Sequence, residues 1–158
     1  MKKNNSYGWP WKPSSGNGIN ISSLAKITVK TVVSRYGTAD PFTIADKLNV
    51  EYFYMPLGKH PLGDTSYDHH DPIVILNESI RESPQRYYTL AHELGHIIMH
   101  ADLTGYHSGI WTYGKYEQQA NQFATGLMGL LFVEENGYEP DNYYNLVNCY
   151  GSPVDFLG

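Results

Sequence analysis

Two histidines and a glutamate stand close together near the middle of the chain, and their spacing is typical of a metal site. His92 and His96 flank Glu93 in the sequence His-Glu-Leu-Gly-His. On a helix, residues four apart lie on one face, so both imidazoles can reach one ion. Glu93 is rotated by about 100° from His92, which places its carboxylate beside such an ion. Zinc would acidify a water and polarise a carbonyl there, while Glu93 would act as general base.

Catalytic zinc needs a third protein ligand, and four later residues are candidates: His100, Asp102, His107 and Glu117. His100 is rotated by about 80° from the metal-facing side of the motif, which favours a core or supporting role. Glu117 is better placed, because small residues on its helix face would let that helix approach the motif at Gly95. A carboxylate that only complements the helix dipole is the alternative for Glu117.

The motif needs a rigid helix, and its flanking residues predict one. Ser83-Pro84 is a helix start, and the pattern extends to about His100. A helix over roughly Lys115 to Glu134 follows a loop rich in glycine and tyrosine. Apolar residues on the other faces of the motif helix can support a buried site: Leu90, Ala91, Leu94, Ile97 and Ile98.

The remaining elements indicate an α+β fold. We expect a small, mostly antiparallel sheet of about three strands, packed against a zincin-like helical core that carries the motif helix. Residues 1–20 are expected to form an irregular arm, and residues 21–158 a single domain. The expected helices are Leu24–Tyr36, a short one from Asp40-Pro41, and Pro140–Tyr150, and the expected strands are Val50–Leu57, Gly63–Tyr67 and Ile73–Leu76.

Two segments resemble the paired helices of the ImmA/IrrE family of metallo-endopeptidases. They are the segment from Tyr88 to His100, with its central His-Glu-Leu-Gly-His, and Glu117-Gln-Gln-Ala-Asn-Gln-Phe-Ala124. The resemblance spans roughly Leu24 to Leu131. One departure is the sequence Leu-Met-Gly-Leu-Leu at residues 127–131, where the family usually has a Leu-Leu-Met-Pro ending. Without that proline the helix is free to continue.

The resemblance implies a site and a biological role. Zinc would be bound by His92, His96 and Glu117, with Glu93 as the catalytic acid and base. The partner would be a helix-turn-helix repressor of a phage or mobile element, which the enzyme cleaves or otherwise inactivates. A non-proteolytic anti-repressor with a structural or vestigial zinc site is the main alternative, and a toxin of a two-gene module is a weaker one.

Composition narrows the classes of partner and compartment. The net charge is −5, and the eleven basic residues are scattered, which argues against direct nucleic-acid binding and favours a protein partner or peptide substrate. Cys149 is the single cysteine, so no internal disulfide can form. With no apolar stretch like a signal peptide or a membrane span, we expect a cytoplasmic protein.

Other polar residues have simpler interpretations. The segment Asp68-His-His-Asp71 has metal-binding residue types, but a solvated turn before a proline is the expected structure. Four residues between the two metal helices could stabilise an oxyanion, and spacing does not choose among them: Tyr106, His107, Tyr113 and Tyr116.

Overall fold

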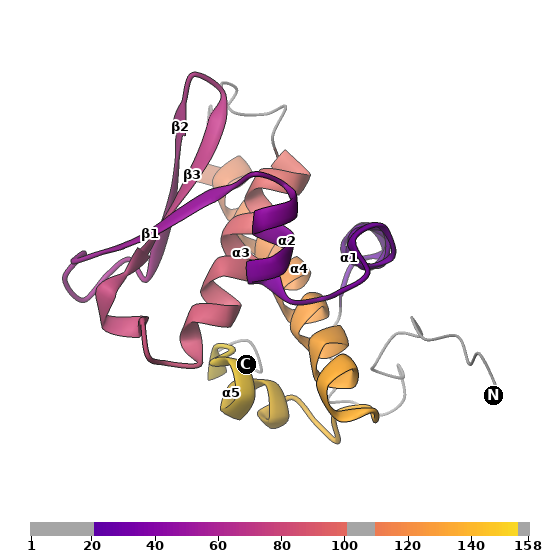
Figure 1. Cartoon of the computed structure of the whole chain (residues 1–158). Helices are drawn as coiled ribbons and strands as arrows, with labels where there is room; N and C mark the ends of the chain where they lie inside the picture. The colour runs from indigo at the N-terminus through magenta and orange to yellow at the C-terminus, as the bar shows by residue number, and fades with distance from the viewer. Residues whose placement is uncertain (1–20, 101–109, 155–158) are drawn as a thin grey trace.

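The structure, a computed structural model, describes residues 21–100 and 110–154, with the side chains of 110–113 left aside. Figure 1 shows a small sheet on one side of the molecule and helices on the other. In chain order the elements are α1 (Ser23–Tyr36), α2 (Pro41–Lys47), β1 (Glu51–Met55), β2 (Gly63–Asp68), β3 (Asp71–Asn77), the 3-10 turn η1 (Glu78–Ile80), α3 (Gln85–His100), α4 (Ile110–Asn136) and α5 (Tyr144–Tyr150). The α+β class is confirmed.

Local sequence signals account for the ends of the first two helices. The Ser22 side chain accepts a hydrogen bond from the backbone N–H of Ala25, and Gly37 closes α1 in the left-handed conformation. Asp40 caps α2 by accepting from the N–H of Phe42, with proline at the first helical position. Both helices were predicted from these residues.

The helix that follows the motif is longer than predicted. α4 begins at Ile110 instead of Lys115 and continues to Asn136, 27 residues in all. The segment at 127–131 lies inside it, as expected for a sequence with no proline there. No helix among the described residues is long and apolar enough to cross a membrane.

The sheet is mixed, whereas the sequence suggested mostly antiparallel pairing. Its strand order is β1-β3-β2, with β1 parallel to β3 and β2 antiparallel to β3. The cause is the apolar run Ile73–Leu76 in β3, which favours the central position. A tight hairpin places β2 on one edge, which leaves the other edge to β1, and β1 runs in the same direction as β3.

The core lies between the sheet and the helices, with α3 in the middle (Figure 1). Leu90 and Leu94 of α3 are fully buried, and so are Val74 and Leu76 on the inner face of β3. On the other side of α3, the apolar residues of α4 complete the core, among them Phe123, Ala124 and Leu127. The motif helix is therefore packed on two sides, which is the rigid support that a metal site requires.

Gly95 allows α3 and α4 to pack closely. A Cβ built on Gly95 would lie 3.0 Å from Cδ1 of Phe123 and 3.3 Å from the backbone of Ala120. Contacts this short at a backbone cannot be relieved by a side-chain rotation. The approach of α4 at Gly95, expected from the small residues near Glu117, is therefore present in the structure.

Replacing Gly95 by valine should push the two helices apart. We expect Gly95→Val to lower the free energy of unfolding by about 1–3 kcal/mol, the usual cost of overpacking. Chemical denaturation followed by circular dichroism measures it. Gly114→Val is the matched control, because a Cβ at Gly114 meets no atom within 4 Å. Equal losses in both variants would show that the helix contact is not the cause.

Candidate metal centre

Side chains of His92, His96 and Glu117 converge at the interface of α3 and α4. The Glu117 carboxylate bridges the two rings, with Oε2 3.2 Å from Nε2 of His92 and Oε1 2.7 Å from Nε2 of His96. Their potential ligand atoms all lie within 4.8 Å of one another. Ligands of a tetrahedral zinc ion are roughly 3.3 Å apart, given bonds of about 2.0–2.1 Å. The cluster thus has the donor types and the dimensions of a zinc site.

The ligand cluster is open on one side. The side chains of His92 and His96 are 15% and 22% exposed, and that of Glu117 is 34% exposed. The two histidines lie one turn apart on α3, with ring centroids 4.8 Å apart. Glu117 reaches them from the second helix. Three protein ligands with one accessible side are typical of catalytic zinc, because a structural site is closed by a fourth ligand.

Glu93 points from α3 toward the edge strand β2. Its carboxylate accepts a hydrogen bond of 2.5 Å from the Thr65 hydroxyl, and the residue is only 7% exposed. β2 lies directly against α3 at this point, since a Cβ on Gly63 would be 2.6 Å from Cγ2 of Thr89. Glu93 is therefore held beside the ligand cluster and does not join it.

Both histidines of the cluster have a further partner besides Glu117. A side-chain hydrogen bond with Asn121 of α4 reaches His92, and Asn121 Oδ1 also accepts from Tyr88 Oη at 3.2 Å. Nδ1 of His96 lies 3.2 Å from Nδ1 of His100. Such outer contacts orient the rings of metal-binding histidines.

Burial and neighbouring charges shift the acid–base properties of the site in opposite directions. Hydrogen bonds from His92 and His96 hold the pKa of Glu117 well below its usual range. Burial lowers the pKa of His92, but the hydrogen bond to Glu117 and the nearby carboxylates outweigh it, so the net shift is upward. Burial raises the pKa of Glu93, opposed by His92 and by the Thr65 hydrogen bond. One carboxyl is thus kept ionised and the other is made more basic, as ligand and base roles require.

A cleft of about 550 Å³ opens onto the cluster. β2 forms one wall and the two helices form the other, with Tyr116 of α4 and Tyr67 of β2 among the lining residues. Tyr67 is 40% exposed, and its pKa is raised by burial and by the charge of Glu93. Tyr116 and Tyr67 are thus two phenols at the cleft that could donate to a developing oxyanion.

Of the four third-ligand candidates, the structure places Glu117 with the histidine pair. His100 is buried next to His96 and belongs to its surroundings. Asp102 and His107 lie outside the described residues, as does Tyr106, and the side chain of Tyr113 is likewise not described. Within the described ranges, His92, His96 and Glu117 form the one group of three or more potential ligands.

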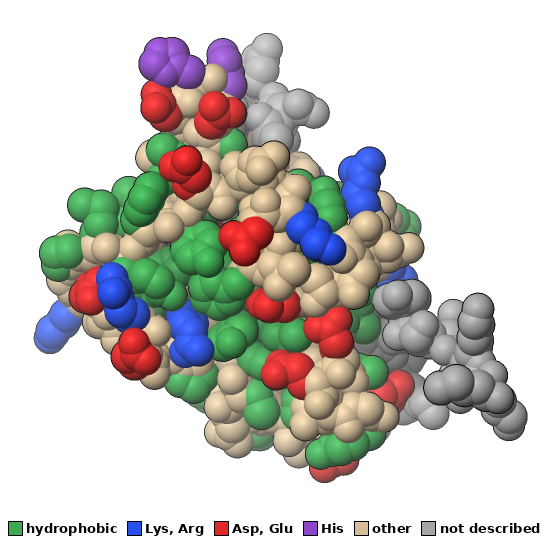
Figure 2. Space-filling model, in the orientation of Figure 1, with side chains coloured by type: hydrophobic (Ala, Val, Ile, Leu, Met, Phe, Trp, Pro, Cys, Tyr) green, Lys and Arg blue, Asp and Glu red, His purple; other side chains and the backbone are tan. Residues whose placement is uncertain are grey.

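The turn at Asp68–Asp71 does not gather into a second metal cluster among the described residues. It forms the tip of the β2–β3 hairpin, where Nδ1 of His69 lies 2.6 Å from Oδ1 of Asp68 at an exposed position. In Figure 2 this tip projects from the body with histidine and acidic side chains on it. The same view shows lysine and arginine scattered over the visible face, as their distribution in the sequence suggested.

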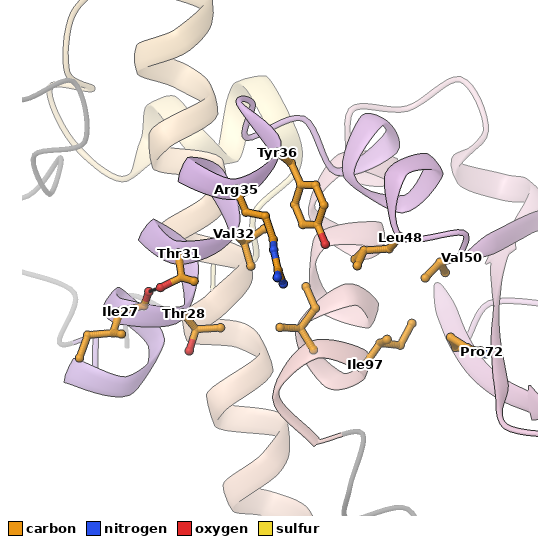
Figure 3. Close-up of a pocket in the computed structure, with 11 residues that line it drawn as sticks. Ile27, Thr28, Thr31, Val32, Arg35, Tyr36, Leu48, Val50, Pro72 and Ile97 are labelled. Atoms are coloured by element: carbon orange, nitrogen blue, oxygen red, sulfur yellow. Dashed lines mark hydrogen bonds between the residues drawn. The ribbon is translucent and has the colours of Figure 1, made fainter.

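A second cavity, of about 410 Å³, is lined on α3 by Ile97 and Ile98 and shares no lining residue with the cleft at Glu93 (Figure 3). It is lined mostly by apolar residues of α1, α3 and the β1 region, with the Arg35 side chain reaching into it. No histidine, carboxylate or cysteine lines this cavity. It therefore lacks the usual metal ligands, and the cleft at Glu93 is the candidate active site.

Sequence reasoning missed the contribution of β2. Thr65, Tyr67 and Gly63 all face the cleft or α3. No local pattern marks them, because their role depends on which edge of the sheet β2 occupies. The contact of Asn121 with His92 was also missed, although its position four residues after Glu117 places it on the same face of α4.

Comparisons with known proteins match the part of the chain that contains this site. A family model described as "IrrE N-terminal-like domain", a peptidase family, matches residues 45–130, which is more than half of the chain. These residues include the motif helix, β2 and Glu117. A relative from Bacillus phage phi105, named "Uncharacterized immunity region protein 2", is 26% identical over 109 residues, which cover 67% of this chain and 68% of the relative.

Removing the Thr65 hydroxyl should make Glu93 harder to ionise. A hydrogen bond to a carboxylate stabilises its charged form, so its loss raises the pKa. We therefore expect the pKa of Glu93 in Thr65→Val to lie above its value in the parent protein, measured by NMR titration of the metal-free protein. Ser66→Ala is the control, because Ser66 is exposed on the other face of β2. A lower or unchanged pKa in Thr65→Val would contradict the assigned contact.

Proposed function

The chain belongs to the family of peptidases with an IrrE N-terminal-like domain, and on that premise we propose that it is a zinc-dependent endopeptidase with Glu93 as general base. The observation that carries this proposal is the arrangement of Glu93 beside the His92–His96–Glu117 cluster at an open cleft. A metal cluster alone would fit a structural role. A buried, basic carboxylate that faces the same cleft without being a ligand favours catalysis.

His92, His96 and Glu117 would bind the zinc ion. When bound, zinc acts as a Lewis acid that lowers the pKa of water and polarises the substrate carbonyl. Glu117 is suited to ligation because its neighbours keep its carboxyl ionised. With neutral histidines and one carboxylate, the ligand set leaves net positive charge for this chemistry.

Glu93 would take a proton from the attacking water and deliver it to the leaving amine. Its low exposure raises its pKa, which makes it a stronger base than a solvated carboxylate. Thr65 fixes the carboxylate by donating to Oε2, which leaves Oε1 available for the water. One carboxylate oxygen is thus used to orient Glu93, and the other would accept the proton from water.

The cleft favours a peptide in extended conformation. β2 is an edge strand, and within the described part of the chain its one strand partner is β3. Successive residues of β2, from Gly63 to Thr65, line the cleft. A free strand edge can bind an extended peptide through main-chain hydrogen bonds. The proposed substrate is therefore an extended polypeptide segment that binds beside Glu93.

A repressor of the helix-turn-helix class is the proposed substrate. The family resemblance supports this choice, and so does the name of the phage relative, which refers to an immunity region. The net charge of −5 fits a basic protein partner better than nucleic acid. Repressors encoded beside the gene for this chain are the first substrates to test.

Replacing the base should abolish cleavage and leave zinc binding intact. We expect Glu93→Gln to lower the rate of repressor cleavage by roughly a hundredfold to ten-thousandfold, the usual contribution of general-base catalysis. Gel-based cleavage assays with zinc-loaded protein measure it, and metal analysis verifies equal zinc content. Should Glu93→Gln relieve repression as fully as the parent protein does, the chain would be a non-proteolytic anti-repressor.

Replacing Glu117, the third ligand, should weaken zinc binding itself, whereas replacing Glu93 should not. Glu117→Gln is expected to weaken zinc binding by more than the roughly 10–100-fold that loss of an outer contact costs, and cleavage should be lost with the metal. Competition with a fluorescent chelator gives the affinity. Glu139→Gln is the control, since Glu139 is exposed and remote from the cluster. Unchanged zinc affinity in Glu117→Gln would remove Glu117 from the ligand set.

A further inference from the structure

A chain of hydrogen-bonded side chains leads away from the metal cluster. Nδ1 of His96 lies 3.2 Å from Nδ1 of His100 on the next turn of α3. Nε2 of His100 lies 2.8 Å from Oε1 of Gln119 on α4. The chain thus begins at a proposed metal ligand, passes through a second imidazole and ends on the neighbouring helix.

The chemistry of these groups sets the direction of every bond in the chain. The amide oxygen of Gln119 can only accept, so Nε2 of His100 must carry a proton. In a neutral imidazole the other nitrogen is then unprotonated, so Nδ1 of His100 accepts. Nδ1 of His96 must therefore be the donor. Once the proton between Nε2 of His96 and Glu117 has left, His96 keeps its proton on Nδ1 and has its lone pair on Nε2, the atom that faces Glu117.

His100 is held firmly in this role. The residue is only 5% exposed, and its ring lies over that of Tyr116, with centroids 4.5 Å apart. A buried imidazole is costly unless its polar atoms are satisfied, and here both nitrogens have partners. The ring cannot turn to offer a different atom without breaking the link to Gln119.

We propose that His100 and Gln119 are positioning residues that fix the proton of His96 on Nδ1 and so present Nε2 to the metal. The inference rests on the proposed zinc site. Histidines that bind metals usually donate to a carboxylate, a carbonyl or water. Here a second histidine, His100, is the acceptor for His96. The amide oxygen of Gln119 determines which nitrogen of His100 carries the proton.

The first test measures zinc affinity in two variants that break the chain of hydrogen bonds at different points. Gln119→Leu removes the acceptor for His100, and His100→Phe keeps a ring against Tyr116 but removes the acceptor for His96. We expect each variant to bind zinc roughly 10–100-fold more weakly. Gln118→Leu is the matched control, because Gln118 is the exposed neighbour on the same helix, and its affinity should equal that of the parent.

A variant with both substitutions tests whether His100 and Gln119 act through one chain of hydrogen bonds or affect zinc binding independently. Once His100 is replaced, Gln119 has no route to His96, so the double variant should bind zinc within about twofold of His100→Phe alone. Independent contributions would instead multiply. Multiplying losses, or single variants with the affinity of the parent protein, would overturn the proposal.

Ring-nitrogen NMR of the parent protein gives a readout that does not depend on the variants folding. At about pH 8, where free histidine is neutral, Nε2 of His100 should be protonated and Nδ1 unprotonated, with a coupling across the bond to His96 Nδ1–H. A proton on His100 Nδ1 would overturn the inference. If the parent protein bound no zinc, the proposed function would fail, while this spectrum would still decide the direction of the bonds.

Discussion

The site depends on how closely α3 and α4 approach each other at Gly95. There the backbone of Ala120 takes the space that any side chain at position 95 would need. This contact determines the distance between a helix that carries two histidines and a helix that carries a carboxylate 21 residues later. At this separation the Glu117 carboxylate reaches both rings, at 3.2 Å from His92 and 2.7 Å from His96. The glycine at position 95 thus allows the close helix approach at which the three side chains of the cluster meet.

Contacts at the same interface offset the free-energy cost of burying several ionisable side chains together. Glu117 is neutralised by the two imidazoles that it contacts, and its carboxylate satisfies both of their inward nitrogens. Protons held between these groups must leave when a cation enters, because ligands bind metals in their deprotonated form. Metal binding at this cluster would therefore be linked to acidity and would weaken as the pH falls. Glu93 points from α3 in another direction, toward β2, so it does not belong to the groups that would release protons when a metal binds.

Local sequence patterns predicted the helices well and the strand arrangement less well. Ser22, Gly37 and Asp40 mark helix ends through contacts within a few residues, so each could be assigned without knowledge of the fold. The spacing of His92 and His96 is also local. Pairing of β1 with β3 is not, because it depends on competition among strands for the central position. For the same reason Thr65 could not be identified as the partner of Glu93. The start of α4 was placed too late because a glycine- and tyrosine-rich segment reads as a loop.

The turn between β2 and β3 has an influence well beyond the four residues that form it. His69 and His70 both have positive φ angles, the backbone of a two-residue turn whose twist matches that of the strands it joins. Such a turn allows one alignment of the strands, in which Thr65 lies opposite Val74 and faces Glu93. A shift by one residue would turn Thr65 outward and bring an aspartate or a serine toward the carboxylate. The hairpin tip, although it is an exposed loop, therefore determines which side chain of β2 contacts the carboxylate of Glu93.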